Sequence, residues 1–423
     1  MRILMRGAID PLEVMSPSKF IIENHTGGNI GNLLYLSSIA RTILTDGTVI
    51  DYVNLKRQRI DDEYIEYVNE NYDIFLIPLA NAFKLKGHDE LTIISRFVKK
   101  LKIPCCIIGV GIQQMLFSDE SFYDYYKYND EAKEMLSAVL EKSPIIGVRG
   151  EYSADYLKTL GFIPEKDYTV IGCPSLFTYG ENLPKTKIIY LTRFSKIAFN
   201  SKSEWEQQEF YTDFIDYLKM NMNRFENTVY VQQRIDDIRM IYLDTLKQNL
   251  KKNKFYDVSK AISFTNANSW IEYLKNSVDF SFGSRIHGNV AAILGGVPSV
   301  TVPFDKRVYE LADYHNIPMI DYKSINEDLN LYDVFNNADF SSIQRGHKER
   351  FVHYIDFLHK IGLKTVYDSK RASEFPYDKI MKSRTYPGVI ESYDALPYEE
   401  KANRYREAFL MYSDKLDNLK RQL

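Results

Sequence analysis

Residues 278–292 read VDFSFGSRIHGNVAA, and this short stretch determines how the rest of the chain is interpreted. An apolar run leads to Gly283 and a polar turn, and a run of small residues follows. A strand, a glycine-containing turn and a helix in this order form the repeating unit of an open parallel α/β sheet. Ligands of such sheets bind just beyond the carboxyl ends of the strands, so the stretch also predicts where a functional site lies.

The same alternation of apolar runs with amphipathic stretches continues in both directions. It predicts strands at 2–6, 48–53, 73–79, 104–110, 144–148, 168–171, 187–191, 228–231, 254–258, 278–281, 297–302 and 318–321. It predicts helices at 33–44, 131–141, 204–220, 236–250, 269–276, 286–294 and 306–314. A turn-rich break near residue 180 divides the strands into two sets. We therefore expect an α/β protein with two Rossmann-like, doubly wound parallel-sheet domains facing a cleft, at 1–180 and 186–330, and a helical C-terminal extension at 331–423.

Composition excludes several classes of protein. The 423 residues carry a formal net charge of -3, which argues against a protein that wraps nucleic acid. Aromatic residues make up 14% of the chain, which argues against a disordered protein. The three cysteines have no zinc-site spacing, and we find no signal peptide and no apolar run long enough to span a membrane. A cytoplasmic protein is expected.

The tyrosine content and the charge of the C-terminal tail can each be interpreted in two ways. The 32 tyrosines reflect either overall amino-acid bias or a carbohydrate-binding surface. From residue 348 onwards the chain has 15 Lys or Arg and 12 Asp or Glu. This mildly basic tail is either a solvated helical face or a peripheral contact with the inner face of a membrane or an anionic lipid-linked substrate.

Arg285 and His287 are the strongest site candidates, because they stand two residues apart where a helix begins. Free backbone N–H groups at a helix start receive anions. The Arg285 guanidinium suits carboxylate or phosphate, and His287 can move protons near neutral pH. Ser284 and Gly288 complete this predicted binding turn. The competing interpretation is a capping arginine and a structural histidine.

Two further cations are expected at the same cleft. Lys306 opens a predicted helix after the strand at 297–302, and Arg193 follows the predicted strand at 187–191. Three converging cations suit a ligand with two anionic groups. For each of the two, an ordinary surface position is the alternative.

Glycine-rich turns mark the first half. Gly28, Asn29 and Asn32 precede the helix at 33–44, where a turn of this kind can cradle a phosphate, although the sequence is neither a P-loop nor a dinucleotide fingerprint. Gly111 follows another strand and lets the backbone approach the cleft. His25 is either structural or catalytic. We see no metal-ligand spacing, so a metal-dependent hydrolase is not expected.

Together these segments resemble the polysaccharide pyruvyl transferase family over roughly residues 20–320. The resemblance is carried by Asn29–Asn32, Gly109–Ile112, Val148–Glu151, Ser153, Leu157–Gly161, Ser284–Gly288, Gly296–Pro298 and Asp305–Lys306. Two positions depart from the family pattern. Asn32 stands where an acidic residue is frequent, and Cys173 stands where an Asp often precedes the proline that closes the first domain.

The resemblance implies a fold of the glycosyltransferase-B type, with phosphoenolpyruvate as donor and a sugar hydroxyl pair as acceptor. Arg285, His287 and Lys306 match donor-site positions, and Arg193 matches an arginine after the first strand of the second domain. The implied reaction forms a cyclic pyruvate ketal during capsular, exopolysaccharide or cell-wall polysaccharide synthesis and requires no redox or metal cofactor. Its acceptor is either lipid-linked or a finished polymer. Two rivals remain: a glycosyltransferase or sugar-nucleotide epimerase on the same scaffold, and a non-catalytic scaffold protein.

Overall fold

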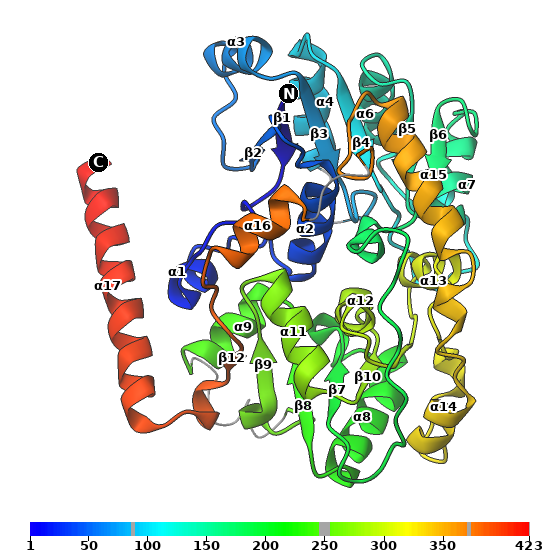
Figure 1. Ribbon diagram of the computed structural model, residues 1–423, viewed down its shortest axis with the longest axis vertical. Helices are drawn as coiled ribbons and strands as arrows, with labels where there is room; N and C mark the ends of the chain where they lie inside the picture. Colours follow the sequence, from blue (N-terminus) through cyan, green and yellow to red (C-terminus); the bar gives the residue numbers. More distant parts are fainter. Residues whose placement is uncertain (86–88, 245–253, 370–373, 423) are drawn as a thin grey trace.

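The computed structural model describes residues 1–85, 89–244, 254–369 and 374–422, and its strands form two separate groups (Figure 1). The first group contains a parallel sheet in the order β2 (Val49–Val53), β1 (Arg2–Arg6), β3 (Ile74–Pro78) and β4 (Cys105–Ile108). A bridge between Val110 and Val148 connects it to the parallel pair β5 (Ile146–Val148) and β6 (Tyr168–Val170).

Helices cover both faces of the first sheet because successive strand residues point to opposite sides. Ile3 and Met5 of β1 belong to an apolar cluster with α1 (Pro17–Ile22) and α2 (Gly31–Ile43). Leu4 belongs to a second cluster with the helices of the other face. Those helices are α3 (Asp62–Asn71), α4 (Asp89–Lys100), α5 (Phe122–Tyr125), α6 (Asn129–Leu140) and α7 (Glu151–Thr159).

The second sheet has the order β11 (Ser299–Thr301), β10 (Phe280–Gly283), β7 (Ile197–Asn200), β8 (Thr228–Val231), β9 (Ala261–Ser263) and β12 (Ile390–Glu391). All its pairings are parallel except that of β12 with β9. Its helices are α8 (Thr212–Arg224), α9 (Ile235–Tyr242), α11 (Ala267–Ser277), α12 (Ile286–Leu294), α13 (Lys306–Tyr314) and α14 (Leu331–Asn337). The predicted α/β class with parallel sheets is confirmed.

The C-terminal region is helical, as expected, and returns to both halves (Figure 1). Phe351 and Tyr354 of α15 (His347–Lys360) pack on Phe177 of the first half. The helix α16 (Pro376–Lys382) contacts α2, whereas β12 extends the second sheet and α17 (Tyr398–Gln422) lies beside α1. In the described part of the chain, no helix is long and apolar enough to cross a membrane.

Several predicted elements of the second half are wrong. Residues 187–191 form no strand, because Ile188 and Tyr190 are 98% and 90% exposed in a connecting segment, and the first strand is β7. Residues 254–258 precede β9 instead of forming it, and 318–321 contributes only a bridge at Met319. The helix predicted at 204–220 begins only at Thr212. The helix predicted at 236–250 corresponds to α9, which ends at Tyr242, and residues 245–250 lie outside the described part of the chain.

Candidate functional site

Arg285 and His287 lie where β10 leads into α12, as the sequence predicts. The backbone N–H of Arg285 donates to Asn200 Oδ1 at 2.7 Å, and its Nε donates to the carbonyl of Ser201 at 3.0 Å. Its Nη2 pairs with Glu204 Oε2 at 2.6 Å. The carboxyl end of β7 thus fixes the guanidinium in position.

The imidazole of His287 is only 8% exposed, and the charges of three arginines act on it. Burial and then the charges of Arg149, Arg307 and Arg285 lower the pKa of His287 well below its usual range. The imidazole is therefore neutral at pH 7. Arg149 follows β5 in the first half, whereas the other two belong to the second half, so both halves build the site.

Arg149 is fully buried, and two of its three side-chain nitrogens lack a hydrogen-bond partner among the described residues. Its Nε donates to the carbonyl of Gly109 at 2.8 Å, and its guanidinium lies 4.7 Å from the centre of the Tyr35 ring. Within the described residues, Nη1 and Nη2 have no hydrogen-bond partner. Leaving a buried charge unpaired is costly, so this geometry points to an anionic ligand.

Asp305 compensates part of the positive charge. Its carboxylate pairs with the buried Lys202 and lies 3.9 Å from Arg307 Nη2, and it accepts the N–H of Val308 at 2.7 Å. Burial lowers the pKa of Lys202 to about 8. Asp305 thus holds Lys202 and the start of α13 together, and its carboxylate is shared between two cations.

Glu310 is a second buried carboxyl beside Arg149 and Arg307. It accepts hydrogen bonds from the Ser153 N–H at 2.9 Å and the Ser153 hydroxyl at 2.8 Å. Burial raises the pKa of Glu310 to about 7. This carboxyl is therefore only partly ionised at neutral pH, which leaves the cluster with an excess of positive charge.

The first half touches His287 at two points. A Cβ on Gly31 would lie 2.6 Å from His287 Nδ1, so only glycine lets the start of α2 come this close. Asn29 Oδ1 accepts the N–H of Gly31 at 2.7 Å and fixes this turn. On the other side of the ring, Cys173 Sγ lies 3.8 Å from His287 Nε2.

Ser284 and Gly288 are buried on either side of the two candidates. The Ser284 hydroxyl contacts the Tyr211 hydroxyl, and a Cβ on Gly288 would lie 2.6 Å from Gln233 Nε2. Both residues shape the turn, and their binding of a substrate stays a prediction.

Lys306 has a different environment from the one expected. Its Nζ donates to Gln114 Oε1 at 2.6 Å and lies 5.4 Å from the centre of the Tyr152 ring, and burial lowers its pKa. The neighbouring Arg307 is the residue of this helix whose charge acts on His287. The role of Lys306 in binding the donor stays a prediction, and Arg307 is a second candidate on the same helix.

The predicted position of Arg193 at the ligand edge is wrong. Arg193 precedes β7, and its carbonyl accepts the N–H of Glu226, which precedes β8. It therefore lies at the amino ends of the strands, opposite the cluster. Its side chain is 67% exposed and pairs with Glu226 at 3.4 Å. Lys202, which follows the true first strand, is the buried cation that reasoning from residues 187–193 missed.

The glycine-rich turn of the first half borders a cavity of about 370 Å³ at the carboxyl end of the first sheet. Asn32 and Tyr35 line it. Gly28 stands outside its wall with φ +104°, where its N–H donates to Asn24 Oδ1 at 3.1 Å and tightens the turn. The ring of Tyr35, which lines the cavity, has its centre 4.7 Å from the Arg149 guanidinium, so the cavity adjoins Arg149.

Gly111 has the close approach predicted for it, because a Cβ there would lie 3.3 Å from Arg149 Cδ. His25 pairs with Glu23 at 2.7 Å. No group of three metal-binding side chains occurs among the described residues.

Arg149 and Arg307 are the functional candidates that sequence reasoning missed. Both had a usable signal. Arg149 directly follows the predicted strand at 144–148, and Arg307 is the second residue of a helix at the predicted ligand edge.

Comparison with known sequences gives one family. The sequence model of polysaccharide pyruvyl transferases matches residues 29–305, a range that contains Arg149, Lys202, Arg285 and His287. No curated protein matches the chain.

Solved structures similar to this chain include three sugar-related proteins. An Anabaena protein solved with UDP and glucose has 12% identity and a TM-score of 0.45, over 85% of this chain and 97% of that one. The UDP-GlcNAc 2-epimerase of Methanocaldococcus jannaschii has 11% identity and a TM-score of 0.45, over 84% and 100%. A glycosyltransferase of Streptomyces nogalater has 9% identity and a TM-score of 0.37, over 84% and 95%.

Proposed function

The chain belongs to the polysaccharide pyruvyl transferase family, and we propose that it moves the pyruvyl group of phosphoenolpyruvate onto two hydroxyls of one sugar. The observation that carries this proposal is the fully buried Arg149, two of whose nitrogens have no partner among the described residues, together with Arg285 and Arg307, whose charges also act on the buried His287. Phosphoenolpyruvate carries a carboxylate and a phosphate on three carbons, and guanidinium groups bind both kinds of anion. The unpartnered nitrogens of Arg149 give the donor a place among these residues.

The proposed reaction needs a proton transfer and no oxidation. A proton adds to the C3 methylene of the donor, which makes C2 electrophilic. One sugar hydroxyl attacks C2 and loses its proton, and a second hydroxyl of the same sugar then displaces phosphate. The products are a cyclic pyruvate ketal and inorganic phosphate, and the chemistry calls for no metal or redox cofactor.

His287 is the proposed proton-transfer group. In the free site its neighbours keep it neutral. The negative charge of a bound donor offsets the arginines, so donor binding raises the pKa of His287 and lets it carry the proton. The arginines hold the leaving phosphate and stabilise its charge.

The 370 Å³ cavity beside the cluster is the proposed acceptor site. Asn24, Asn32 and Asn81 supply hydrogen-bonding groups to its wall, which suits hydroxyls. The acceptor we propose is a sugar of a capsular, exopolysaccharide or cell-wall polysaccharide, with a lipid-linked oligosaccharide at the inner face of the membrane as one form of it.

The decisive experiment combines turnover with ligand binding. The protein is incubated with phosphoenolpyruvate and candidate sugars, phosphate release is measured, and the ketal carbon is sought by NMR, with His287→Ala as control. We expect phosphate release with an acceptor and thermal stabilisation by phosphoenolpyruvate. Stabilisation by nucleotide-sugars alone, with no phosphate released, would favour a glycosyltransferase or epimerase.

A further inference from the structure

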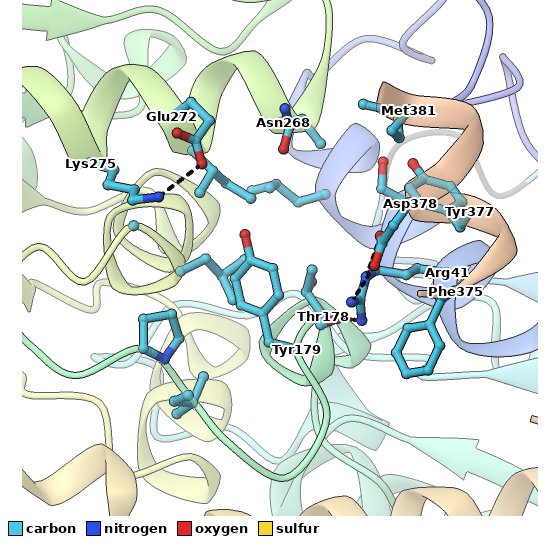
Figure 2. A pocket seen from close by; sticks show the side chains of 18 of the residues that line it. Arg41, Thr178, Tyr179, Asn268, Glu272, Lys275, Phe375, Tyr377, Asp378 and Met381 are labelled. Atoms are coloured by element: carbon cyan, nitrogen blue, oxygen red, sulfur yellow. Dashed lines mark hydrogen bonds and ion pairs between the residues drawn. The ribbon is translucent and has the colours of Figure 1, made fainter. Parts of the chain in front are cut away.

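A second cavity, of about 830 Å³, lies between the two halves away from His287. It is bordered by α2, α11, α12, α16 and the segment 178–184 (Figure 2). Gly31 begins α2 beside His287, and Arg41, ten residues further, lines the cavity. His287 stands at the start of α12, and Gly295 after its end lines the cavity. With a rise of 1.5 Å per residue, Arg41 lies roughly 15 Å from Gly31 along α2, and Gly295 lies roughly 12 Å from His287 along α12.

One wall of this cavity is formed by an ion pair and by two aromatic rings that pack against its arginine. Arg41 binds Asp378 of α16 through two contacts, Nε to Oδ1 at 2.8 Å and Nη2 to Oδ2 at 2.7 Å. Its guanidinium lies 4.8 Å from the centre of the Phe375 ring and 5.6 Å from that of Tyr179. Figure 2 shows the Tyr179 and Phe375 rings at the edge of the cavity, on either side of Thr178.

Polar groups at the cavity remain available to a ligand. Neither the Tyr179 hydroxyl nor the Asn268 amide has a hydrogen-bond partner among the described residues, and both residues line the cavity. Burial raises the pKa of Tyr179 to about 12, so its hydroxyl stays protonated and can donate. Flat rings combined with free hydroxyl and amide groups suit a molecule that has both apolar faces and hydroxyls.

The charges of the cavity select against anions. Its lining contains three cations and three carboxylates, namely Arg41, Lys275, Lys382, Glu272, Glu374 and Asp378. The carboxyl ends of α2 and α12 add partial negative charge. A phosphate or uronic acid therefore has no net attraction here, in contrast to the arginine cluster.

We propose that this cavity binds uncharged sugar residues of the polysaccharide, distant from the sugar that reacts. The proposal rests on the proposed function for the identity of the polymer, and on the cavity itself for the chemistry of the ligand. Its volume lies in the range of small-molecule sites, and such sites are frequent between domains. Sugar rings present C–H faces to aromatic rings, and their hydroxyls fit the free donors and acceptors of Tyr179 and Asn268.

Binding is tested without turnover. Short uncharged gluco-, galacto- and manno-oligosaccharides are added to the His287→Ala protein, and saturation-transfer NMR and calorimetry measure their binding. The same binding measurements are made on His287→Ala proteins that also carry Tyr179→Ala, Tyr179→Phe or, as a control at an exposed residue, Tyr123→Ala. We expect Tyr179→Ala to weaken binding about 10-fold, Tyr179→Phe to weaken it less, and Tyr123→Ala to change nothing. Equal binding by the Tyr179→Ala protein, or binding of none of the probes, would overturn the proposal.

Turnover separates this proposal from the function on which it rests. With His287 intact, Tyr179→Ala should raise KM for an oligosaccharide acceptor and leave KM for phosphoenolpyruvate unchanged. Suppose that Tyr179→Ala loses sugar binding and that the wild type releases no phosphate. This result would support sugar binding in the cavity and contradict pyruvyl transfer. Normal phosphate release with oligosaccharide KM unaffected by Tyr179→Ala would contradict the cavity alone.

Discussion

Cys173 Sγ lies 3.8 Å from His287 Nε2, across the boundary between the two halves. A thiol is a weak hydrogen-bonding group. Burial first, and then the charges of Arg149, Arg307 and Arg285, hold the pKa of His287 well below its usual range. The position of Cys173 is also one at which the sequence departs from the family pattern.

Replacing Cys173 with Asp should raise the pKa of His287 by at least about one unit, because an adjacent carboxylate favours the imidazolium. The new carboxylate also faces Arg149 and should weaken donor binding. NMR titration of His287 in the wild type, in Cys173→Asp and in Cys173→Ala measures the shift. An Asp variant that titrates like the Ala variant would show that the two side chains do not interact.

His287→Ala should lower turnover at least about 100-fold, since general acid–base catalysis is lost. Affinity for phosphoenolpyruvate should change much less, because the arginines carry the anion binding. His287→Gln should be almost as inactive, since an amide can hydrogen-bond but cannot transfer the proton. Turnover, donor affinity and melting temperature of the three proteins check this. Near-normal turnover in the Gln variant would leave His287 as a positioning residue.

Arg149→Met should abolish donor binding while the melting temperature stays level or rises. The wild type pays for a buried guanidinium with two unpartnered nitrogens, and Met removes that charge at similar volume. The pKa of His287 should also rise, because Arg149 lowers it. Calorimetry with phosphoenolpyruvate and a thermal melt give both readouts. A large fall in melting temperature would mean that Arg149 serves the fold.

Gly31→Ala should reduce activity strongly, because the new Cβ would lie 2.6 Å from His287 Nδ1 and would displace the ring. Gly388→Ala is the matched control, since nothing lies within 4 Å of a Cβ there. Kinetics and melting temperature of both variants are compared. Full activity in Gly31→Ala would show that the contact between α2 and His287 does not matter for turnover.

Glu310 should make the protein less stable as the pH rises. The pKa of Glu310 is about 7 in the folded protein and 4.5 in the unfolded chain. Its contribution to the free energy of unfolding is therefore complete below pH 4.5 and is lost as the pH rises through 7. The loss amounts to at most about 3 kcal/mol. Urea unfolding at pH 5 and pH 8 should show this fall in the wild type and a smaller one in Glu310→Gln. Identical pH dependence of the two proteins would contradict the raised pKa.

The sequence predicted the site best where one chain segment carries the whole pattern. The turn with Arg285 and His287, together with the helix 286–294, could be located because strand, turn and helix follow each other without interruption. The parallel α/β class followed from the same repetition. The clustering of Arg149 with these residues could not be derived, because it depends on how the two halves face each other.

The error at Arg193 has a different cause. Residues 187–191 and 197–200 are both short apolar runs after a lysine, and periodicity does not distinguish them. Only the structure shows that Ile188 and Tyr190 face solvent while Ile197 and Phe199 are buried. Choosing the first run moved the expected cation from the carboxyl edge of the sheet to the amino edge.

The pairing of β12 with β9 has a consequence for how the chain acquires its structure. Residues 390–391 complete a sheet whose other strands end at residue 301. During synthesis, the second half therefore exposes an unpaired edge at β9 until residues 390–391 have left the ribosome. Contacts over such a sequence separation form slowly, and open edges invite association with other chains. Expression of a version ending before β12 should yield aggregate where the full-length chain yields dispersed protein.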